Sequence, residues 1–192
     1  MYNIAIFASG TGTNAEKIIN HFETVDNISV SLLISDRSQA KALSVADSKG
    51  VTSKYFSRKT FSEDGEKVLE YLGEKKIDFI VLAGFLYLVP RSIVKAYHGR
   101  IVNIHPALLP DFGGKGMYGN RVHEAVIKSG NKFSGITIHY VNEEYDEGGI
   151  ILQEEVKIDE QETPNSLREK IQKLEHFHYP KTIEKLIKTK LS

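Results

Sequence analysis

An apolar run at residues 101–105, IVNIH, carries two polar side chains and is typical of a buried strand. Side chains two residues apart point to the same face of a strand, so we expect Asn103 and His105 to project together. Pro106 follows and withholds a backbone donor, which ends the strand there. A buried amide and a buried imidazole need partners or a catalytic task. The alternative is that a loop carbonyl satisfies the histidine and that the asparagine starts a turn.

A glycine-rich turn, SGTGTN at residues 9–14, lies between a strand-like run and a helix-like run. Gly10, Gly12 and Ala15 satisfy the dinucleotide-binding pattern G-x-G-x-x-G/A, and Asp36 closes the next strand-like run, about 20 residues further on. Three interpretations are open: a dinucleotide site, a tight turn without a ligand, and a phosphate site made by backbone N–H groups at a helix start. Hydroxyl and amide side chains crowd the turn, which suits a phosphate monoester better than a pyrophosphate.

A carboxylate lies in the link between two long strand-like runs, residues 133–141 and 149–158. Asp146 precedes a pair of glycines there, so the default role is that of a turn former. A catalytic role requires that Asp146 meets His105. In that case the carboxylate would fix the tautomer of the ring, raise its pKa and make it a proton donor at neutral pH.

The other histidines give weaker signals. Thr137 and His139 share a face of the run 133–141, where they either support the same cluster or line a solvated strand, and we expect the second. The remaining histidines are interpreted as surface or packing residues: His21, His98, His123, His176 and His178. The last two resemble a metal pair only superficially, because side chains two apart diverge on a helix.

Composition and charge narrow the possible functions. The chain has 192 residues, 41% of them hydrophobic, which suits one domain with a sizeable core. Lys+Arg and Asp+Glu are both 25, so no overall field recruits nucleic acid or an anionic membrane. The absence of cysteine excludes disulfides and thiolate catalysis. The strand-like residues begin at Tyr2 and no apolar run approaches the roughly 20 residues of a membrane span, so we expect a cytoplasmic protein without a signal peptide.

Strand-like and helix-like runs alternate through the first hundred residues, as in a parallel sheet covered on both faces. The expected strands are residues 2–7, 28–35, 78–84 and 101–105, and the expected helices are 15–22, 39–50, a charged stretch ending near Lys76, and one after Pro90. The runs 133–141 and 149–158 should pair antiparallel, because their link is too short for a helical crossover. A helix is expected from Thr163-Pro164. The fold class is therefore α/β: a single-domain, Rossmann-like, mostly parallel sheet with an antiparallel C-terminal strand pair and a long C-terminal helix.

Four motifs together resemble the phosphoribosylglycinamide formyltransferase family, within the folate-dependent formyltransferases. They are SGTGTN, VLAGFLYLVP at residues 81–90, NIHPALLP at 103–110 and DEGGIILQ at 146–153, and the resemblance runs over nearly the whole chain. It implies transfer of a formyl group from 10-formyltetrahydrofolate to the amine of glycinamide ribonucleotide in purine biosynthesis. One domain, 1–192, would hold a phosphate-binding half (1–100) and a folate and catalytic half (101–192). We expect small-molecule partners only, without nucleic acid, membrane or metal, in a monomer or a homodimer.

The resemblance also implies roles for individual residues. Asn103, His105 and Asp146 match the family's catalytic trio. The matches to substrate-binding positions are Gly12, Thr13, Asn14, Gly84, Pro106, Gln172 and Glu175, of which Gln172 would reach the phosphate and Glu175 the amine. The matches to the folate cleft are Phe85, Leu86, Tyr87, Leu88, Val89 and Val94. The chain departs from the family pattern at Leu86-Tyr87, where a Met-Arg pair is common, and in the loop DFGGKGMYGNRVH, which is longer and richer in glycine.

This trio implies an acyl-transfer mechanism. A neutral amine would attack the formyl carbon while Asn103 and a protonated His105 donate hydrogen bonds to the developing oxyanion. Asp146 would keep His105 charged and help to pass a proton to the leaving nitrogen. The alternatives are another 10-formyltetrahydrofolate-dependent formyltransferase or hydrolase, a nicotinamide-dependent oxidoreductase that uses the glycine turn, and a phosphate-binding module without catalysis.

Overall fold

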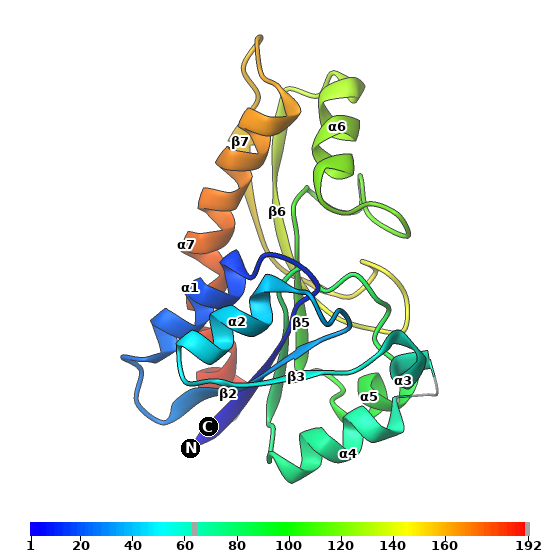
Figure 1. The fold of residues 1–192 in the computed structure, drawn as a ribbon. Coiled ribbons are helices and arrows are strands. Elements are labelled where there is room, and N and C mark those ends of the chain that lie inside the picture. Colours follow the sequence, from blue (N-terminus) through cyan, green and yellow to red (C-terminus); the bar gives the residue numbers. More distant parts are fainter. Residues whose placement is uncertain (63–64, 191–192) are drawn as a thin grey trace.

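The computed structural model describes residues 1–62 and 65–190. Within these ranges seven strands form one sheet in the order β3-β2-β1-β4-β5-β6-β7 (Figure 1). The strands are β1 (Tyr2–Phe7), β2 (Ile28–Ser35), β3 (Thr52–Tyr55), β4 (Phe79–Leu82), β5 (Ile101–His105), β6 (Phe133–Tyr140) and β7 (Ile150–Lys157). β1 to β5 run parallel, whereas β6 pairs antiparallel with both β5 and β7. The predicted fold class is confirmed.

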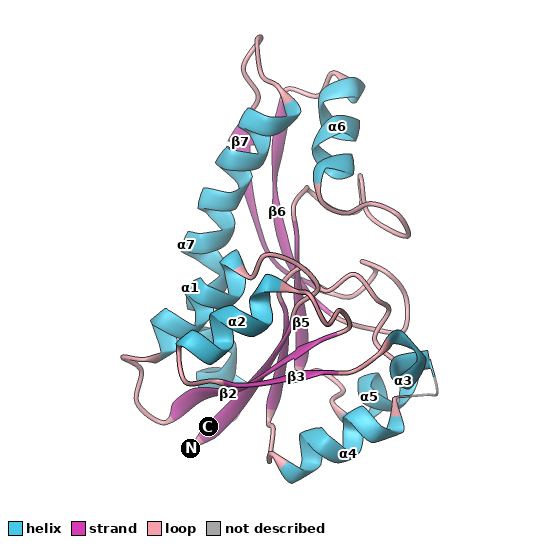
Figure 2. Ribbon diagram, viewed as in Figure 1, coloured by secondary structure: helices cyan, strands magenta, loops and turns pink. Residues whose placement is uncertain are grey.

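Helices cover both faces of this sheet (Figure 2). They are α1 (Thr13–Phe22), α2 (Lys41–Ser48), α3 (Arg58–Ser62), α4 (Glu66–Glu74), α5 (Arg91–Ala96), α6 (Asn120–Ser129) and α7 (Pro164–Lys190). The core has two parts, one beneath α1, α2, α6 and α7 and the other beneath α3, α4 and α5. No helix in the described ranges has the length and apolarity to cross a membrane.

The central strand β1 shows why the sheet is covered on both sides. Ile4 and Ile6 pack into the first part of the core, whereas Ala5 and Phe7 pack into the second. All four side chains are completely buried. Successive side chains of a strand point to opposite faces, so a continuous apolar run requires an apolar layer on each face.

Three elements differ from the sequence prediction. β3 was not predicted, because it is an edge strand with mostly exposed residues and therefore carries no apolar pattern. α6 was not predicted either, because it follows a long glycine-rich loop and only two of its apolar residues, Val122 and Val126, are buried. The charged stretch expected to be one helix forms α3 and α4, and its residues 63–64 lie outside the described residues.

The C-terminal helix α7 begins as predicted at Thr163-Pro164. The N–H of Ser166 donates to Thr163 Oγ1 (3.2 Å), which is the expected N-cap contact. Further along, the Tyr179 ring is fully buried and its hydroxyl lies 2.9 Å from the Leu82 carbonyl oxygen and 3.2 Å from that of Val102. A single side chain therefore joins α7 to both β4 and β5.

We predict that Tyr179→Phe lowers the free energy of unfolding by about 1–2 kcal/mol, because the ring still packs while two strand carbonyls lose a hydrogen-bond donor. Urea denaturation followed by circular dichroism measures this change. Tyr55→Phe is the matched control, since Tyr55 lies on the edge strand and is 43% exposed. Equal stabilities of the two variants would contradict the role given to the Tyr179 hydroxyl.

Candidate functional site

The antiparallel pairing of β5 with β6 brings four polar side chains together. Asn103 lies directly opposite His139, and His105 lies opposite Thr137. Residues directly opposite one another in such a pair point to the same face. Thr137 and His139 are 0% and 2% exposed, so the prediction that they line a solvated strand is wrong. That prediction missed the cross-strand register, which no local pattern in the sequence specifies.

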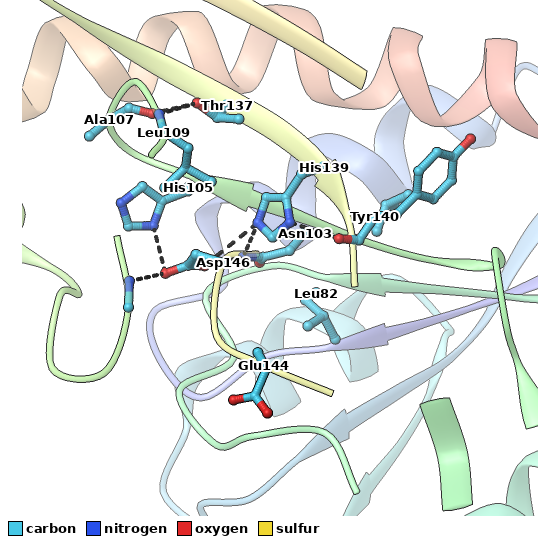
Figure 3. Close-up of polar contacts among 12 residues, drawn as sticks. Leu82, Asn103, His105, Ala107, Leu109, Thr137, His139, Tyr140, Glu144 and Asp146 are labelled. Carbon is cyan, nitrogen blue, oxygen red and sulfur yellow. Dashed lines mark hydrogen bonds and ion pairs between the residues drawn. The ribbon is translucent and has the colours of Figure 1, made fainter. Parts of the chain in front are cut away.

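Asp146 enters this cluster from the link between β6 and β7 (Figure 3). Its Oδ2 lies 3.5 Å from His105 Nδ1 and accepts a hydrogen bond from the Gly114 N–H (2.9 Å). Its Oδ1 lies 3.6 Å from His139 Nε2 and 3.4 Å from Asn103 Nδ2. The predicted trio of Asn103, His105 and Asp146 is therefore brought together, and His139 belongs to the same cluster.

The backbone of this link holds the Asp146 carboxylate in position. Asp146 has a φ of 58°, in the left-handed region that residues other than glycine rarely adopt. Two residues later, a Cβ on Gly148 would overlap the carbonyl oxygen of Tyr140. The link thus packs directly against the end of β6, and a strained backbone at a cluster of polar residues is typical of a functional site.

Carbonyl partners fix the proton positions on both imidazole rings. His105 Nε2 lies 2.8 Å from the Phe112 carbonyl oxygen, so Nε2 carries a proton and Nδ1 faces Asp146. His139 Nδ1 lies 2.8 Å from the Tyr140 carbonyl oxygen, so its Nε2 accepts a hydrogen bond from Asn103 Nδ2 (3.1 Å). Each ring therefore has one nitrogen committed to the backbone and one directed into the cluster.

Burial controls the charge of the cluster. It lowers the pKa of His105 below the ordinary value, and the attraction of Asp146 offsets this effect only in part. The predicted effect of Asp146, which is to raise the pKa of His105, is confirmed, but the expectation that His105 stays protonated at neutral pH is wrong because burial has the larger effect. Burial also opposes ionisation of Asp146, but contacts with His139, His105 and Gly114 outweigh it and lower the pKa of the carboxyl. The cluster thus combines a neutral imidazole with an ionised carboxylate at neutral pH.

Thr137 holds the chain that leaves β5. Its hydroxyl donates to the Ala107 carbonyl (2.7 Å) and accepts from the Leu109 N–H (2.9 Å). Gln153 Nε2 adds hydrogen bonds to Thr137 Oγ1 (3.0 Å) and to the Leu109 carbonyl (2.8 Å). The segment after His105 is therefore anchored to β6 and β7, which restricts the position of the imidazole.

The glycine turn lies at the start of α1. Gly12 has a φ of 81°, and a Cβ there would lie 2.7 Å from the Cα of Ala42, so the approach of α2 requires glycine. No side chain caps α1, which leaves the first N–H groups of the helix for a ligand. Such N–H groups and the helix dipole favour an anion.

Asp36 does not have the position that a ribose-binding acid would need. Its side chain is completely buried, and its Oδ1 accepts a hydrogen bond from Ser9 Oγ (2.5 Å). Its Oδ2 pairs with Arg58 Nε at 3.0 Å. Both oxygens thus have partners inside the protein, which argues against the dinucleotide interpretation of the turn.

Residues from opposite ends of the chain meet at this turn. Gln172 Nε2 donates to Thr13 Oγ1 (3.1 Å), and Asn14 Nδ2 donates to Glu175 Oε2 (2.9 Å). Asn14 Oδ1 is buried without a hydrogen-bond partner within the described residues. The substrate-binding positions inferred on α1 and α7 are therefore in direct contact.

A cavity of about 630 Å³ connects these groups. The predicted site residues that line it are Asn14, Gly84, Phe85, Leu86, Tyr87, Leu88, Val89, Asn103, His105, Pro106, Asp146, Gln172 and Glu175. Gly12 and Thr13 line an adjoining cavity of about 210 Å³. Val94 lies on α5 within the second part of the core and is not among the lining residues of either cavity.

Several residues of the cavity wall were not identified from the sequence. His123 was interpreted as a surface or packing residue, but it is 3% exposed and lines the large cavity. Burial, with smaller effects from the charges of Arg168 and His105, lowers the pKa of His123 to about 4. Four cationic side chains also line this cavity: Arg37, Arg58, Lys115 and Arg168. No pattern in the sequence marks His123, because the helix that contains it, α6, was not predicted.

Among residues 1–62 and 65–190, no group of three or more histidine, cysteine, aspartate or glutamate side chains is placed to hold a metal ion.

Comparison with known proteins identifies relatives of this chain. The chain is 41% identical over 187 residues to the chloroplastic phosphoribosylglycinamide formyltransferase of Arabidopsis thaliana, covering 94% of this chain but only 63% of that protein. It is 36% identical over 191 residues to phosphoribosylglycinamide formyltransferase of Bacillus subtilis (strain 168), covering 97% of this chain and 95% of that protein.

A solved structure shares the fold. The crystal structure of phosphoribosylglycinamide formyltransferase from Bacillus Halodurans matches with a TM-score of 0.89 and 43% identity, covering 99% of this chain and 97% of that chain. The model of the formyl transferase family matches residues 2–183. The chain therefore belongs to the formyl transferase family.

Proposed function

We propose that this protein transfers a formyl group from 10-formyltetrahydrofolate to the amine of glycinamide ribonucleotide, the activity named in its relatives. The main support is that one cavity joins the cluster of Asn103, His105 and Asp146 to residues of α1 and α7. An acyl transfer needs hydrogen-bond donors and a proton carrier next to a bound amine. These groups are supplied here by separate elements that converge on the same space.

The ribonucleotide is placed between α1 and α7. Its phosphate lies against the N–H groups at the start of α1, with Gly12, Thr13, Asn14 and Gln172 around it. Its amine lies near Glu175, one turn beyond Gln172 on the same helix. The unpartnered Asn14 Oδ1 supplies a further acceptor at this point.

The folate donor occupies the part of the cavity lined by residues 84–89, GFLYLV. The sequence of this segment is mainly apolar, which suits an aromatic ring system. The segment is fixed at one point because the N–H of Leu86 donates to Ser9 Oγ (2.9 Å). Leu86 and Tyr87 line the cavity although they depart from the common Met-Arg pair, so this pocket recognises the folate with apolar and aromatic side chains there.

His105 acts as the proton carrier. As the amine nitrogen bonds to the formyl carbon, the amine loses a proton. This proton passes, directly or through water, to His105 Nδ1, which lies beside Asp146, since Nε2 already carries a proton. The imidazolium then lies between the Asp146 carboxylate and the Phe112 carbonyl oxygen, and both stabilise its positive charge. The same proton moves to the leaving nitrogen of the folate as the old carbon–nitrogen bond breaks.

Asn103 donates to the oxyanion that forms on the formyl oxygen. Its amide nitrogen contacts His139 Nε2 at 3.1 Å and Asp146 Oδ1 at 3.4 Å, and the longer contact is the weaker one. We propose that Asn103 exchanges the contact with Asp146 for the oxyanion, while His139 keeps the amide in place. A donor of this kind contributes about 3–4 kcal/mol to transition-state stabilisation.

The deciding experiment offers 10-formyltetrahydrofolate to the purified protein with glycinamide ribonucleotide, transfer RNA and water as competing acceptors. We expect formylated ribonucleotide as the product. Release of free formate alone would indicate a hydrolase, and formylated transfer RNA would indicate a different member of the family. Tight binding of NADH in a fluorescence titration, without formyl transfer, would favour the oxidoreductase alternative.

Replacing the proton carrier should abolish most of the activity. We predict that His105→Ala lowers kcat by about 10²- to 10⁴-fold, because the variant loses both proton transfer and charge stabilisation. Steady-state formyl-transfer kinetics measure this effect, and circular dichroism checks that the fold is kept. His98→Ala is the control, because His98 is exposed and does not line the cavity. Near-normal turnover of His105→Ala would refute the assignment.

Glu175 should make stability depend on pH. Burial raises the pKa of its carboxyl to about 7 from an ordinary value of 4.5. The folded state therefore holds this proton more tightly than the unfolded chain. The contribution of this proton to the free energy of unfolding is fully present below pH 4.5 and is lost as the pH rises through about 7. Ionised Glu175 thus destabilises the protein at alkaline pH.

We predict that Glu175→Gln raises the free energy of unfolding by about 1–3 kcal/mol at pH 8, because glutamine never bears the buried charge. The gain should shrink at about pH 5, where the native carboxyl is protonated, and kcat/KM for the ribonucleotide should fall. Thermal unfolding at both pH values measures the stability effect. Glu169→Gln, on the exposed side of the same helix, serves as the control and should change stability at neither pH. A pH-independent gain in Glu175→Gln would contradict the raised pKa.

A further inference from the structure

The residues placed around the substrate phosphate carry no formal positive charge. The side chains of Thr13, Asn14 and Gln172 are neutral, and the backbone N–H groups of α1 contribute only partial charge. A phosphate monoester bears a charge of about −1.5 to −2 at neutral pH. The protein as a whole has a formal net charge of zero, so it does not supply a general attraction for anions. A cation close to the glycine turn would therefore add substantially to binding.

Arg168 is a cation at the required position. It lies four residues before Gln172 on α7, and side chains with this spacing share a face of a helix. It lines the large cavity together with Thr11 and Asn14 of the glycine turn. Gln172 on the same face contacts Thr13 directly (3.1 Å), so a side chain one turn away is within reach of the same ligand.

The Arg168 side chain contacts the first residue of α6. Its Nη1 donates to Asn120 Oδ1 at 3.4 Å. The residue before Asn120, Gly119, lines the smaller cavity together with residues 10–14 of the glycine turn. α6 and α7 pack against each other. The guanidinium is thus attached to the segment that faces the glycine turn across the smaller cavity.

The charge of Arg168 is not neutralised by a carboxylate. Arg58 pairs with Asp36 and Arg91 with Glu143, whereas no carboxylate lies within 4.0 Å of the Arg168 guanidinium in the described part of the chain. Its field also acts inside the cavity, because it contributes to the lowered pKa of His123 in the cavity wall. An uncompensated guanidinium at a cavity wall is a ready partner for a phosphate.

On the basis of the function proposed above, we propose that Arg168 binds the phosphate of the ribonucleotide opposite the N–H groups of α1. Arg168 then determines that the enzyme accepts the phosphorylated substrate in preference to its unphosphorylated riboside. Lys115 also lines the cavity, but it lies on the glycine-rich loop rather than beside Gln172. Arg168 projects from the same helix as Gln172, one turn away, and contacts Asn120, so it is the residue better placed for a contact with the phosphate.

The kinetic test compares two acceptors in two variants. Arg168→Gln should lower kcat/KM for glycinamide ribonucleotide by about 10- to 100-fold, mainly through KM, because the phosphate contact is made in both the ground state and the transition state. It should leave kcat/KM for the riboside and KM for 10-formyltetrahydrofolate unchanged. Arg121→Gln is the matched control: Arg121 stacks on Tyr118 but does not line either cavity.

Two kinetic outcomes would overturn the proposal. An equal loss with ribonucleotide and riboside would mean that Arg168 only supports the fold through Asn120. A raised KM for the folate alone would mean that Arg168 binds the carboxylates of the folate tail. Partial recovery in Arg168→Lys would support a role that depends on charge.

A binding measurement separates this inference from the proposed reaction. Ribose 5-phosphate, titrated by calorimetry, should bind the native protein about tenfold or more tightly than it binds Arg168→Gln, and the difference should shrink at high salt. Equal affinities, or no binding to the native protein, would refute the phosphate role of Arg168. If ribose 5-phosphate binds through Arg168 but formyl transfer is absent, the proposed reaction fails while the phosphate site stands.

Discussion

The pairing of β5 with β6 is the interaction on which the site depends. β5 is the last parallel strand of the sheet, and its carboxyl end is where open α/β sheets place their ligands. Because β6 runs the opposite way, it sets His139 opposite Asn103 and Thr137 opposite His105. Asn103 thereby obtains a partner, His139 Nε2, inside an apolar sheet. The link to β7 then returns Asp146 to the same face, so one register positions the whole cluster.

The second constraint is the C-terminal helix, which completes the site from the far end of the chain. Tyr179 joins α7 to β4 and β5, whereas Gln172 and Glu175 contact the first turn of α1. The same helix therefore contributes to the core and to the substrate-binding wall. Arg168 extends that wall by one turn toward α6. The stability of the protein and its proposed substrate binding therefore depend on a single element.

Burial decides the direction of the pKa shifts of His105 and Glu175, whereas hydrogen bonds and nearby charges keep Asp146 ionised. Burial lowers the pKa of His105 despite a carboxylate at 3.5 Å and raises that of Glu175 to about 7. In the proposed reaction a neutral His105 takes a proton from the amine, and the Asp146 carboxylate and the Phe112 carbonyl lie next to the ring, where they would stabilise the resulting charge. Burying the Glu175 carboxyl costs stability once the group is ionised. This cost is consistent with the proposed contact between Glu175 and the substrate amine, because residues that serve binding need not stabilise the fold.

The fold class, most of the strands and the shared face of Asn103 and His105 could be predicted from the amino-acid sequence, because they depend on local periodicity along a strand or a helix. The motifs of the sequence also identified Asp146, Gln172 and Glu175 through resemblance. Other properties became visible only in the folded structure. His139 contacts Asn103, and His123 and Arg168 line the cavity. The Asp36 carboxylate is hydrogen-bonded to Ser9 and paired with Arg58, and burial lowers the pKa of His105. These properties depend on cross-strand register, helix packing and burial, and such contacts between residues distant in sequence leave no periodic signal in the chain.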